Sequence, residues 1–161
     1  MIIQQNNVHT KIVLEKVNDK YKVMEDIQYN IMGTILTVPK GFITDLASIP
    51  TSLQGIIPKQ GLYDAGAILH DYLYSSQSIY PINRYDSDRI FHYVMVECGV
   101  DTKLADIMYN AVRIGGESHY QRIKDNGYIP QDKSSLIDKR KIYMEYVEKR
   151  DKLIPRYKDM K

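Results

Sequence analysis

The chain has 161 residues, of which 43% are hydrophobic and 26% charged, and this size and composition are typical of one soluble globular domain. No apolar run approaches the ~20 residues of a membrane-spanning helix. The single cysteine, Cys98, excludes an internal disulfide and a cysteine-cluster metal site. The net charge of +2 is not gathered into a basic stripe, which argues against nucleic-acid binding.

Short runs of partly alternating hydrophobic residues make up the N-terminal third. Lys11 to Val17 and Tyr21 to Ile27 flank the segment Asn18-Asp19-Lys20. Asn and Asp tolerate the left-handed backbone of a tight turn, so this pattern predicts a β-hairpin. Ile31 to Val38 predicts a third strand, with Gly33 at a turn or bulge. We therefore expect a small antiparallel β-meander.

A long irregular segment follows from Gly41 to Gly61, interrupted by glycines and prolines. A loop of this length in a compact domain is more often functional than idle. Asp45 and Ser48 lie in it, and their side chains are of the kind that forms turns and caps. We expect these two residues to support the loop, with a position over the site as the alternative.

Three helices are predicted after this loop. Leu62 to Ser75 is rich in Ala, Leu and Ile, and Arg84 to Gly99 carries apolar residues at three- and four-residue steps. A third helix with the same spacing begins at Asp101 or Thr102 and ends at Gly115-Gly116.

A last helix is predicted to begin at Ser134 or Ser135 and to be limited by Pro155. Its residues expected to face inward are Leu136, Ile142, Tyr143, Tyr146 and Val147. Strands followed by helices predict an α+β fold: a small N-terminal antiparallel β-meander, a long loop and three to four packed helices. We expect residues 1–131 to form a single domain and residues 132–161 to form a C-terminal amphipathic helical extension.

His70 and Asp71 interrupt the otherwise apolar first helix. His70 shares a face with Gly66, and so small a residue lets another helix approach closely. The second helix then offers Asp88 near its start. If Asp88 reaches the imidazole, its carboxylate would fix the tautomer and stabilise the protonated ring, which is general-base chemistry. Asp71 points elsewhere, toward a cation or the preceding loop.

A structural interpretation of the same residues stays open. A His and an Asp between packed helices can also form a hydrogen-bonded clasp that holds the ASIP segment, residues 47–50, without any substrate.

Four motifs, VPKGFITDLASIP, GLYDAGAILHDYLY, RYDSDRIFHYVM and MYNAVRIGG, resemble in order and spacing the phage and prophage family catalogued as domain of unknown function 1353. The resemblance covers about residues 34–116. It implies a viral or prophage origin and a family whose activity is unassigned.

The helix pair alone is similar to that of A-type phospholipases, which carry a His-Asp-x-x-Tyr helix and a partner Asp. That likeness implies His70 as base, Asp71 as calcium ligand, Tyr74 as a supporting hydroxyl and Asp88 as the residue that orients His70. A divalent cation such as calcium is thus the one cofactor candidate.

Three functions follow as hypotheses. The first is a virion- or tail-associated structural or assembly component with a His-Asp centre, made in the host cytoplasm and incorporated in the virion among other phage proteins. The second is a hydrolase that uses His70 and Asp88 on an ester, lipid or cell-wall bond. The third is an inhibitor that binds a host protein through the basic C-terminal helix.

Overall fold

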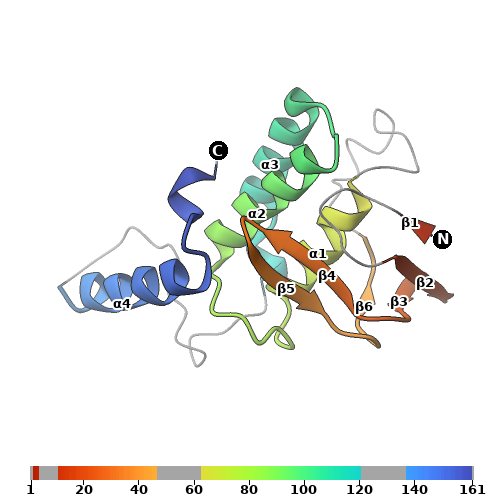
Figure 1. The fold of residues 1–161 in the computed structure, drawn as a ribbon, viewed down its shortest axis with the longest axis horizontal. Coiled ribbons are helices and arrows are strands. Elements are labelled where there is room, and N and C mark those ends of the chain that lie inside the picture. The colour runs from red at the N-terminus through yellow and green to blue at the C-terminus, as the bar shows by residue number, and fades with distance from the viewer. Residues whose placement is uncertain (1, 4–10, 47–62, 121–136, 161) are drawn as a thin grey trace.

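The computed structural model describes residues 2–3, 11–46, 63–120 and 137–160, and Figure 1 shows their arrangement. In this part of the chain, antiparallel strands come first and helices follow, so the predicted α+β class is confirmed. No helix among the described residues is both long and apolar enough to cross a membrane.

The strands form two antiparallel sheets. The first has the order β1-β2-β3-β6, with the bounds β1 Ile2–Ile3, β2 Ile12–Val17, β3 Lys20–Val23 and β6 Ile43–Thr44. The second pairs β4 (Ile27–Ile31) with β5 (Thr34–Val38). The predicted hairpin turn is present between β2 and β3, where Val17 pairs with Lys20 and Asn18 takes a left-handed φ of 57°.

The predicted second and third strands have different boundaries in the structure. The run from Tyr21 to Ile27 is divided between β3 and the start of β4. The run from Ile31 to Val38 is divided by a turn at Met32 and Gly33, whose φ angles are 52° and 94°. The amide of Gly33 donates to Asn30 Oδ1 at 2.7 Å, so the turn is held by a local side chain.

The helices are α1 Asp64–Tyr74, α2 Arg84–Glu97, α3 Thr102–Gly115 and α4 Ile137–Leu153, with short 3₁₀ turns η2 Glu117–His119 and η4 Tyr157–Asp159. The side chain of Asn83 caps α2 by accepting from the amide of Asp86 at 2.8 Å. Asp101 is one of the two residues at which α3 was predicted to begin. Its side chain caps α3 by accepting from the amides of Lys103 and Leu104. Gly99 follows α2 with φ 93°, which favours glycine.

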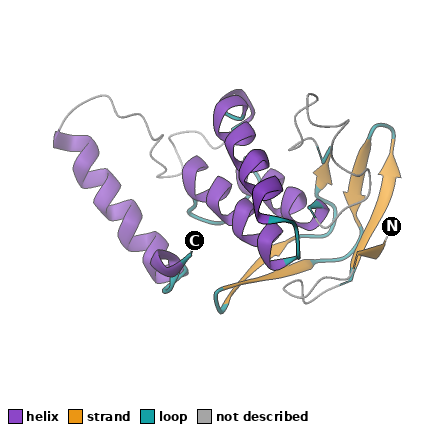
Figure 2. Cartoon of the chain, turned by 90° about the horizontal axis from the view of Figure 1, so that it is seen from above, coloured by secondary structure: helices purple, strands orange, loops and turns teal. Residues whose placement is uncertain are grey.

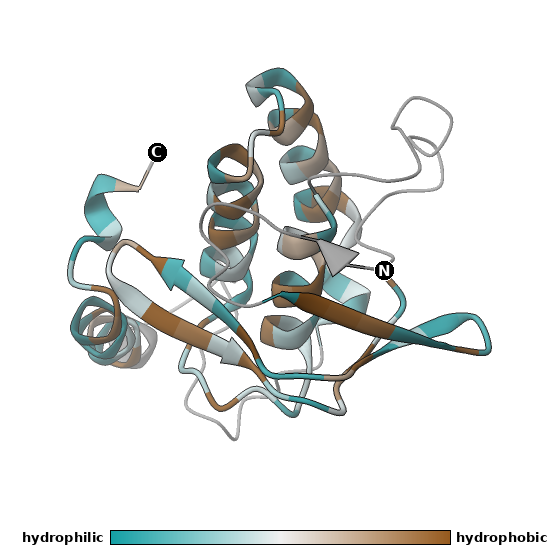
Figure 3. Cartoon of the chain, turned by 45° about the vertical axis from the view of Figure 1, so that its right-hand side comes forward, coloured by the Kyte–Doolittle hydropathy of each residue, from teal (hydrophilic) through white to brown (hydrophobic). Residues whose placement is uncertain are grey.

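Two apolar clusters hold these elements together. One joins the strands to α1, α2 and the C-terminal turn, and the other fills the space between α1, α2 and α3. Fully burying one such aliphatic or aromatic side chain contributes about 1.5–3 kcal/mol. The hydropathy colours of Figure 3 vary along the longer helices and strands, as expected for elements with one buried and one exposed face.

The C-terminal helix lies beside the three-helix group, on the side away from most of the strands (Figure 2). Tyr146 of α4 and Tyr157 of η4 both donate hydroxyl hydrogen bonds to the buried carboxylate of Asp86. The prediction that Ile142 and Tyr143 face inward is wrong, because these side chains are 45% and 40% exposed.

The reason is that α4 is anchored near its C-terminal end through polar contacts and not along a continuous apolar stripe. Tyr146 is buried as predicted, and Val147 is half-buried. Leu136 lies outside the described residues. The division of the chain into residues 1–131 and 132–161 stays a prediction.

Candidate functional site

Close packing of α1 against α2 places His70. Gly66 lies one turn before His70, and a Cβ atom added there would be 3.2 Å from both Met95 Cγ and Phe91 Cδ2 of α2. These contacts are tight, so an added Cβ would require the two α2 side chains to shift by a few tenths of an ångström. The glycine therefore allows α2 to bring Asp88 to the face of α1 on which His70 lies.

His70 and Asp88 form a buried pair. His70 Nε2 lies 2.7 Å from Asp88 Oδ1, and the two side chains are 3% and 0% exposed. The Tyr74 hydroxyl donates to the same Oδ1 at 2.5 Å. The imidazole is also held between the rings of Tyr74 and Phe91, with centroid separations of 4.1 and 4.8 Å. The structure thus brings together the three residues for which we predicted catalytic roles, and those roles stay predictions.

Arg113 completes the surroundings of Asp88. Its Nη1 donates to Asp88 Oδ2 at 2.6 Å from the last turn of α3. Sequence reasoning did not single out this residue. The one signal was its place beside the apolar stripe of α3, inside the motif MYNAVRIGG.

These donors determine the protonation states of the cluster. Burial by itself would raise the pKa of Asp88, but the hydrogen bond and charge of His70 and the hydrogen bonds from Tyr74 and Arg113 hold that pKa below its ordinary value. Burial, followed by the charge of Asp88, raises the pKa of Tyr74. At neutral pH Asp88 is therefore a carboxylate and Tyr74 remains a hydrogen-bond donor.

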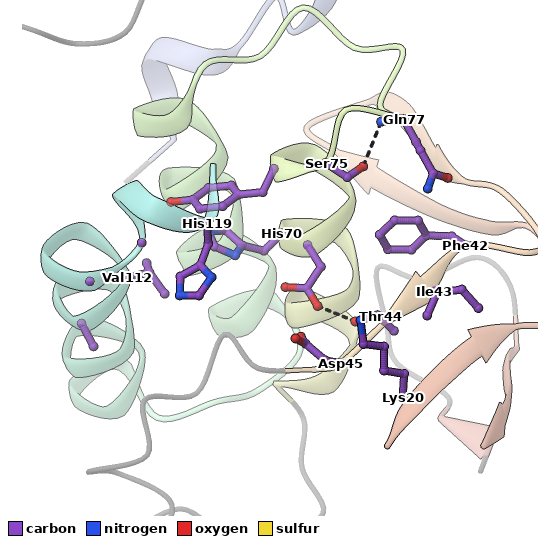
Figure 4. A pocket seen from close by; sticks show the side chains of 15 residues that line it. Lys20, Phe42, Ile43, Thr44, Asp45, His70, Ser75, Gln77, Val112 and His119 are labelled. Carbon is purple, nitrogen blue, oxygen red and sulfur yellow. Dashed lines mark hydrogen bonds between the residues drawn. The ribbon is translucent and has the colours of Figure 1, made fainter. Parts of the chain in front are cut away.

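A cavity of about 500 Å³ opens beside this cluster (Figure 4). His70, Asp71 and Tyr74 of α1 line it, and β6 with its flanking residues and the end of α3 supply other walls. Asp88 is not among the lining residues, so its charge acts on the cavity through His70. His119 of η2 also lines the cavity and is exposed.

The loop residues divide between the described and the undescribed part of the chain. Asp45 lines the cavity, whereas Ser48 and the rest of the ASIP segment lie outside the described residues. The Thr44 hydroxyl donates to the carboxylate of Asp71. Thr44 Oγ1 in turn accepts from the amide of Leu46 at 3.1 Å. Thr44 lies in the segment predicted as an irregular loop, where the structure forms the short strand β6, so Asp71 does contact that segment, and its predicted cation role stays a prediction.

The predicted metal role of Asp71 finds no group of ligands in the described part of the chain. No set of three or more His, Cys, Asp or Glu side chains there is placed to hold an ion. Calcium takes six to eight oxygen ligands, of which Asp71 and Asp45 would be two candidates at the cavity. The described residues alone therefore do not make a calcium site, and we route no chemistry through one.

A second His–Asp pair lies elsewhere on α2. His92 Nε2 is 2.7 Å from Asp106 Oδ1 of α3, and the two side chains are 17% and 58% exposed. Neither residue lines the cavity. The pair matches His70–Asp88 in distance but not in burial or position, which makes it a useful control.

The comparisons with known proteins place the site within one family. A family model described as "Protein of unknown function (DUF1353)" matches residues 21–112. Neither a curated protein nor a solved structure matches the chain. The matched segment contains His70, Tyr74 and Asp88 and ends one residue before Arg113.

Proposed function

We propose that this chain, which belongs to DUF1353, a family of proteins of unknown function, is a hydrolase. In this proposal His70, supported by Asp88, is the general base. One observation carries the proposal. The imidazole that lines a cavity of about 500 Å³ is paired through Nε2 with a fully buried carboxylate. A polar cluster of this kind is costly to bury and is typical of sites that move a proton.

The reaction uses a water molecule in the cavity. The second ring nitrogen, Nδ1, takes a proton from the water while the water oxygen forms a bond to the carbonyl carbon of an ester. The resulting imidazolium keeps its Nε2 proton directed at Asp88, which stabilises the positive charge. The imidazolium then gives its proton to the alkoxide as the carbon–oxygen bond breaks, and the ring returns to its neutral form.

Of the bonds considered, a carboxylic ester fits this site best. Glycoside hydrolysis generally uses two carboxyl groups, one as acid and one as base or nucleophile. Here the group supported by a buried partner is an imidazole, which suits the attack of water on a carbonyl carbon. Phe42 and Ile43 on one side and Val112 on another give the cavity apolar walls for an acyl or alkyl group.

Two separate contacts leave from α1. The Thr44 hydroxyl donates to Asp71 and joins α1 to β6, whereas His70 pairs with Asp88 of α2. The clasp hypothesis concerns residues 47–50, which lie outside the described residues, so it stays an alternative that the test below has to separate from the hydrolase.

The test compares two matched His variants on three substrates. Wild type, His70→Asn and His92→Asn are assayed with a short-chain p-nitrophenyl ester, a phospholipid in detergent micelles and purified peptidoglycan. We expect turnover of the ester, a fall in kcat/KM of at least ~10²-fold for His70→Asn, and wild-type rates for His92→Asn. Thermal unfolding of each variant confirms that the assay measures folded protein.

Two results would overturn the hydrolase. One is the absence of turnover on all three substrates, and the other is an equal loss in both His variants. A loss of activity in His70→Asn that is matched by a loss of folded protein would support the clasp instead.

The virion- or tail-associated role stays a proposal and is compatible with hydrolysis. It would have the chain made in the host cytoplasm and carried in the particle. Mass spectrometry of purified particles tests it, because a virion component is present at a defined copy number. The inhibitor hypothesis stays a prediction, to be tested by whether a host protein binds the full chain but not a chain truncated before residue 132.

A further inference from the structure

We infer that Arg113 is a positioning residue of this site, whose guanidinium sets how tightly Asp88 retains a proton on His70. The inference rests on the proposed function and adds a residue that neither the sequence motifs of the helix pair nor the family match contains. Through Arg113, the end of α3 would influence proton transfer by His70 of α1 and Asp88 of α2.

The contacts of Asp88 place Arg113 opposite His70. Oδ1 is shared by His70 and Tyr74, whereas Oδ2 accepts from Arg113 Nη1 at 2.6 Å. Donors on both oxygens prevent the carboxylate from rotating about its Cβ–Cγ bond. Because the carboxylate is fixed, the direction of the bond to His70 Nε2 is fixed as well.

Residues in the first turn of α2 hold Arg113 in position. Arg84 Nη2 donates to the carbonyl oxygens of Val112 and Arg113 at 2.9 and 2.6 Å, which ties the end of α3 to the start of α2. The guanidinium of Arg113 also lies over the ring of Tyr85, 5.2 Å from its centroid. Arg113 is 25% exposed, so these contacts rather than complete burial determine its direction.

Gly116, directly after α3, leaves room for the Tyr74 hydroxyl of α1, which is the other side-chain donor to Asp88 besides His70 and Arg113. A Cβ atom at this position would be 2.5 Å from the Val112 carbonyl oxygen and 2.9 Å from the Tyr74 hydroxyl oxygen. A larger residue would therefore force both the backbone at the end of α3 and the Tyr74 hydroxyl to shift. The last residues of α3 and the glycine after it therefore control the surroundings of both carboxylate oxygens.

The charges explain what Arg113 contributes. With His70 neutral, the charges of Asp88 and Arg113 cancel, and the buried cluster carries no net charge. After proton transfer the cluster carries one positive charge next to the cavity, where the tetrahedral intermediate of an ester is negative. Without Arg113 the carboxylate would be uncompensated, and it would hold the proton on His70 to higher pH.

Other charged groups face the pair and have to be considered. Tyr74 donates to Asp88, Arg84 lies near the Tyr74 hydroxyl, and Tyr109 of α3 lies near enough to feel the charge of Asp88. Asp45, Asp71, Lys20 and His119 line the cavity. None of these cavity-lining groups is within hydrogen-bonding distance of Asp88 in the described structure. A change at Arg113 therefore acts on the pair more directly than a change at any of the four.

The test follows the titration of the His70 imidazole by NMR, with the resonance assigned by its loss in His70→Asn. We expect the midpoint to move up by about one pH unit in Arg113→Gln, which keeps a donor but no charge, and to stay near wild type in Arg113→Lys. Arg89→Gln is the control, since Arg89 lies 5.9 Å from the same Tyr85 ring but donates to the Met160 carbonyl oxygen. Arg113→Met replaces Arg113→Gln if the latter does not fold.

An unchanged midpoint in the folded, uncharged variant would overturn the inference, and so would an equal shift in Arg89→Gln. If the hydrolase proposal holds, the acid limb of the pH dependence of kcat/KM moves by the same amount. A shifted midpoint in a protein that cleaves no ester would sustain the inference about Arg113 and refute the proposed function, so the two can be separated.

Discussion

Replacement of Asp88 by Asn removes the charge of the buried pair while keeping its shape. The amide has one accepting oxygen and one donating nitrogen, whereas the carboxylate accepts from three donors on two oxygens. The orientation that costs least keeps the oxygen toward His70 and Tyr74. It turns the amide nitrogen toward Arg113, which is 25% exposed and can reach water.

The expected loss follows from this arrangement. One charge-assisted hydrogen bond is removed, worth about 1.5–3 kcal/mol, and the cost stays below that of leaving a fully buried charge unpaired. We therefore expect Asp88→Asn to lower the free energy of unfolding by about 2 kcal/mol at pH 7. The loss should depend on pH, because the pKa of Asp88 in the folded chain lies below its ordinary value.

A group with a lowered folded-state pKa stabilises the fold at pH values above its unfolded pKa, and this contribution is lost as the pH falls toward the folded value. The difference between wild type and Asp88→Asn should thus be full above about pH 4 and shrink below it. Urea unfolding followed by far-UV circular dichroism measures it, since the chain has no tryptophan to report on. Equal stability at pH 7, or a difference that does not change between pH 7 and pH 3, would refute this reasoning.

Three further changes test the packing around the site. Gly116→Ala should destabilise the fold by about 1–3 kcal/mol in thermal unfolding, because its Cβ would lie 2.5 Å from the Val112 carbonyl oxygen and 2.9 Å from the Tyr74 hydroxyl, whereas Gly115→Ala has no neighbour within 4 Å and should not. Tyr74→Phe should cost about 1 kcal/mol in urea unfolding, since the carboxylate of the pair loses one of its donors; no measurable loss would contradict this. Tyr157→Phe should cost about 1–2 kcal/mol and increase proteolysis of the C-terminal segment, because the buried carboxylate of Asp86 loses a hydroxyl donor; wild-type protection would argue against this anchor.

Local patterns in the sequence were sufficient for the helix pair. The spacing of small and apolar residues places Gly66 and His70 on one face of α1, and the structure shows α2 approaching there. Asp88 follows at the start of α2 because only a short link separates the helices. The hairpin at Asn18 was predictable for the same reason, since a tight turn depends on a few adjacent residues.

Contacts between distant segments were not predictable in this way. Whether Arg113 reaches Asp88 depends on how α3 crosses α2 and on its rotation, and helical periodicity determines neither. The anchoring of α4 was missed because it uses hydroxyl groups directed at Asp86, whereas the apolar pattern suggested an inward face with Ile142 and Tyr143. A turn or bulge at Gly33 was predicted, but the positive φ of the preceding Met32 was not, because this conformation is uncommon for methionine.

The central claim is that the imidazole of His70 takes the proton in the reaction. Rescue of His70→Ala by added imidazole tests it most directly, because the truncation leaves room beside a cavity of about 500 Å³ and leaves Asp88 in place to orient the guest ring. We predict an inactive variant whose ester hydrolysis, above the protein-free blank, rises with imidazole concentration and saturates. A folded His70→Ala that keeps wild-type activity, or that imidazole does not rescue, would contradict the account.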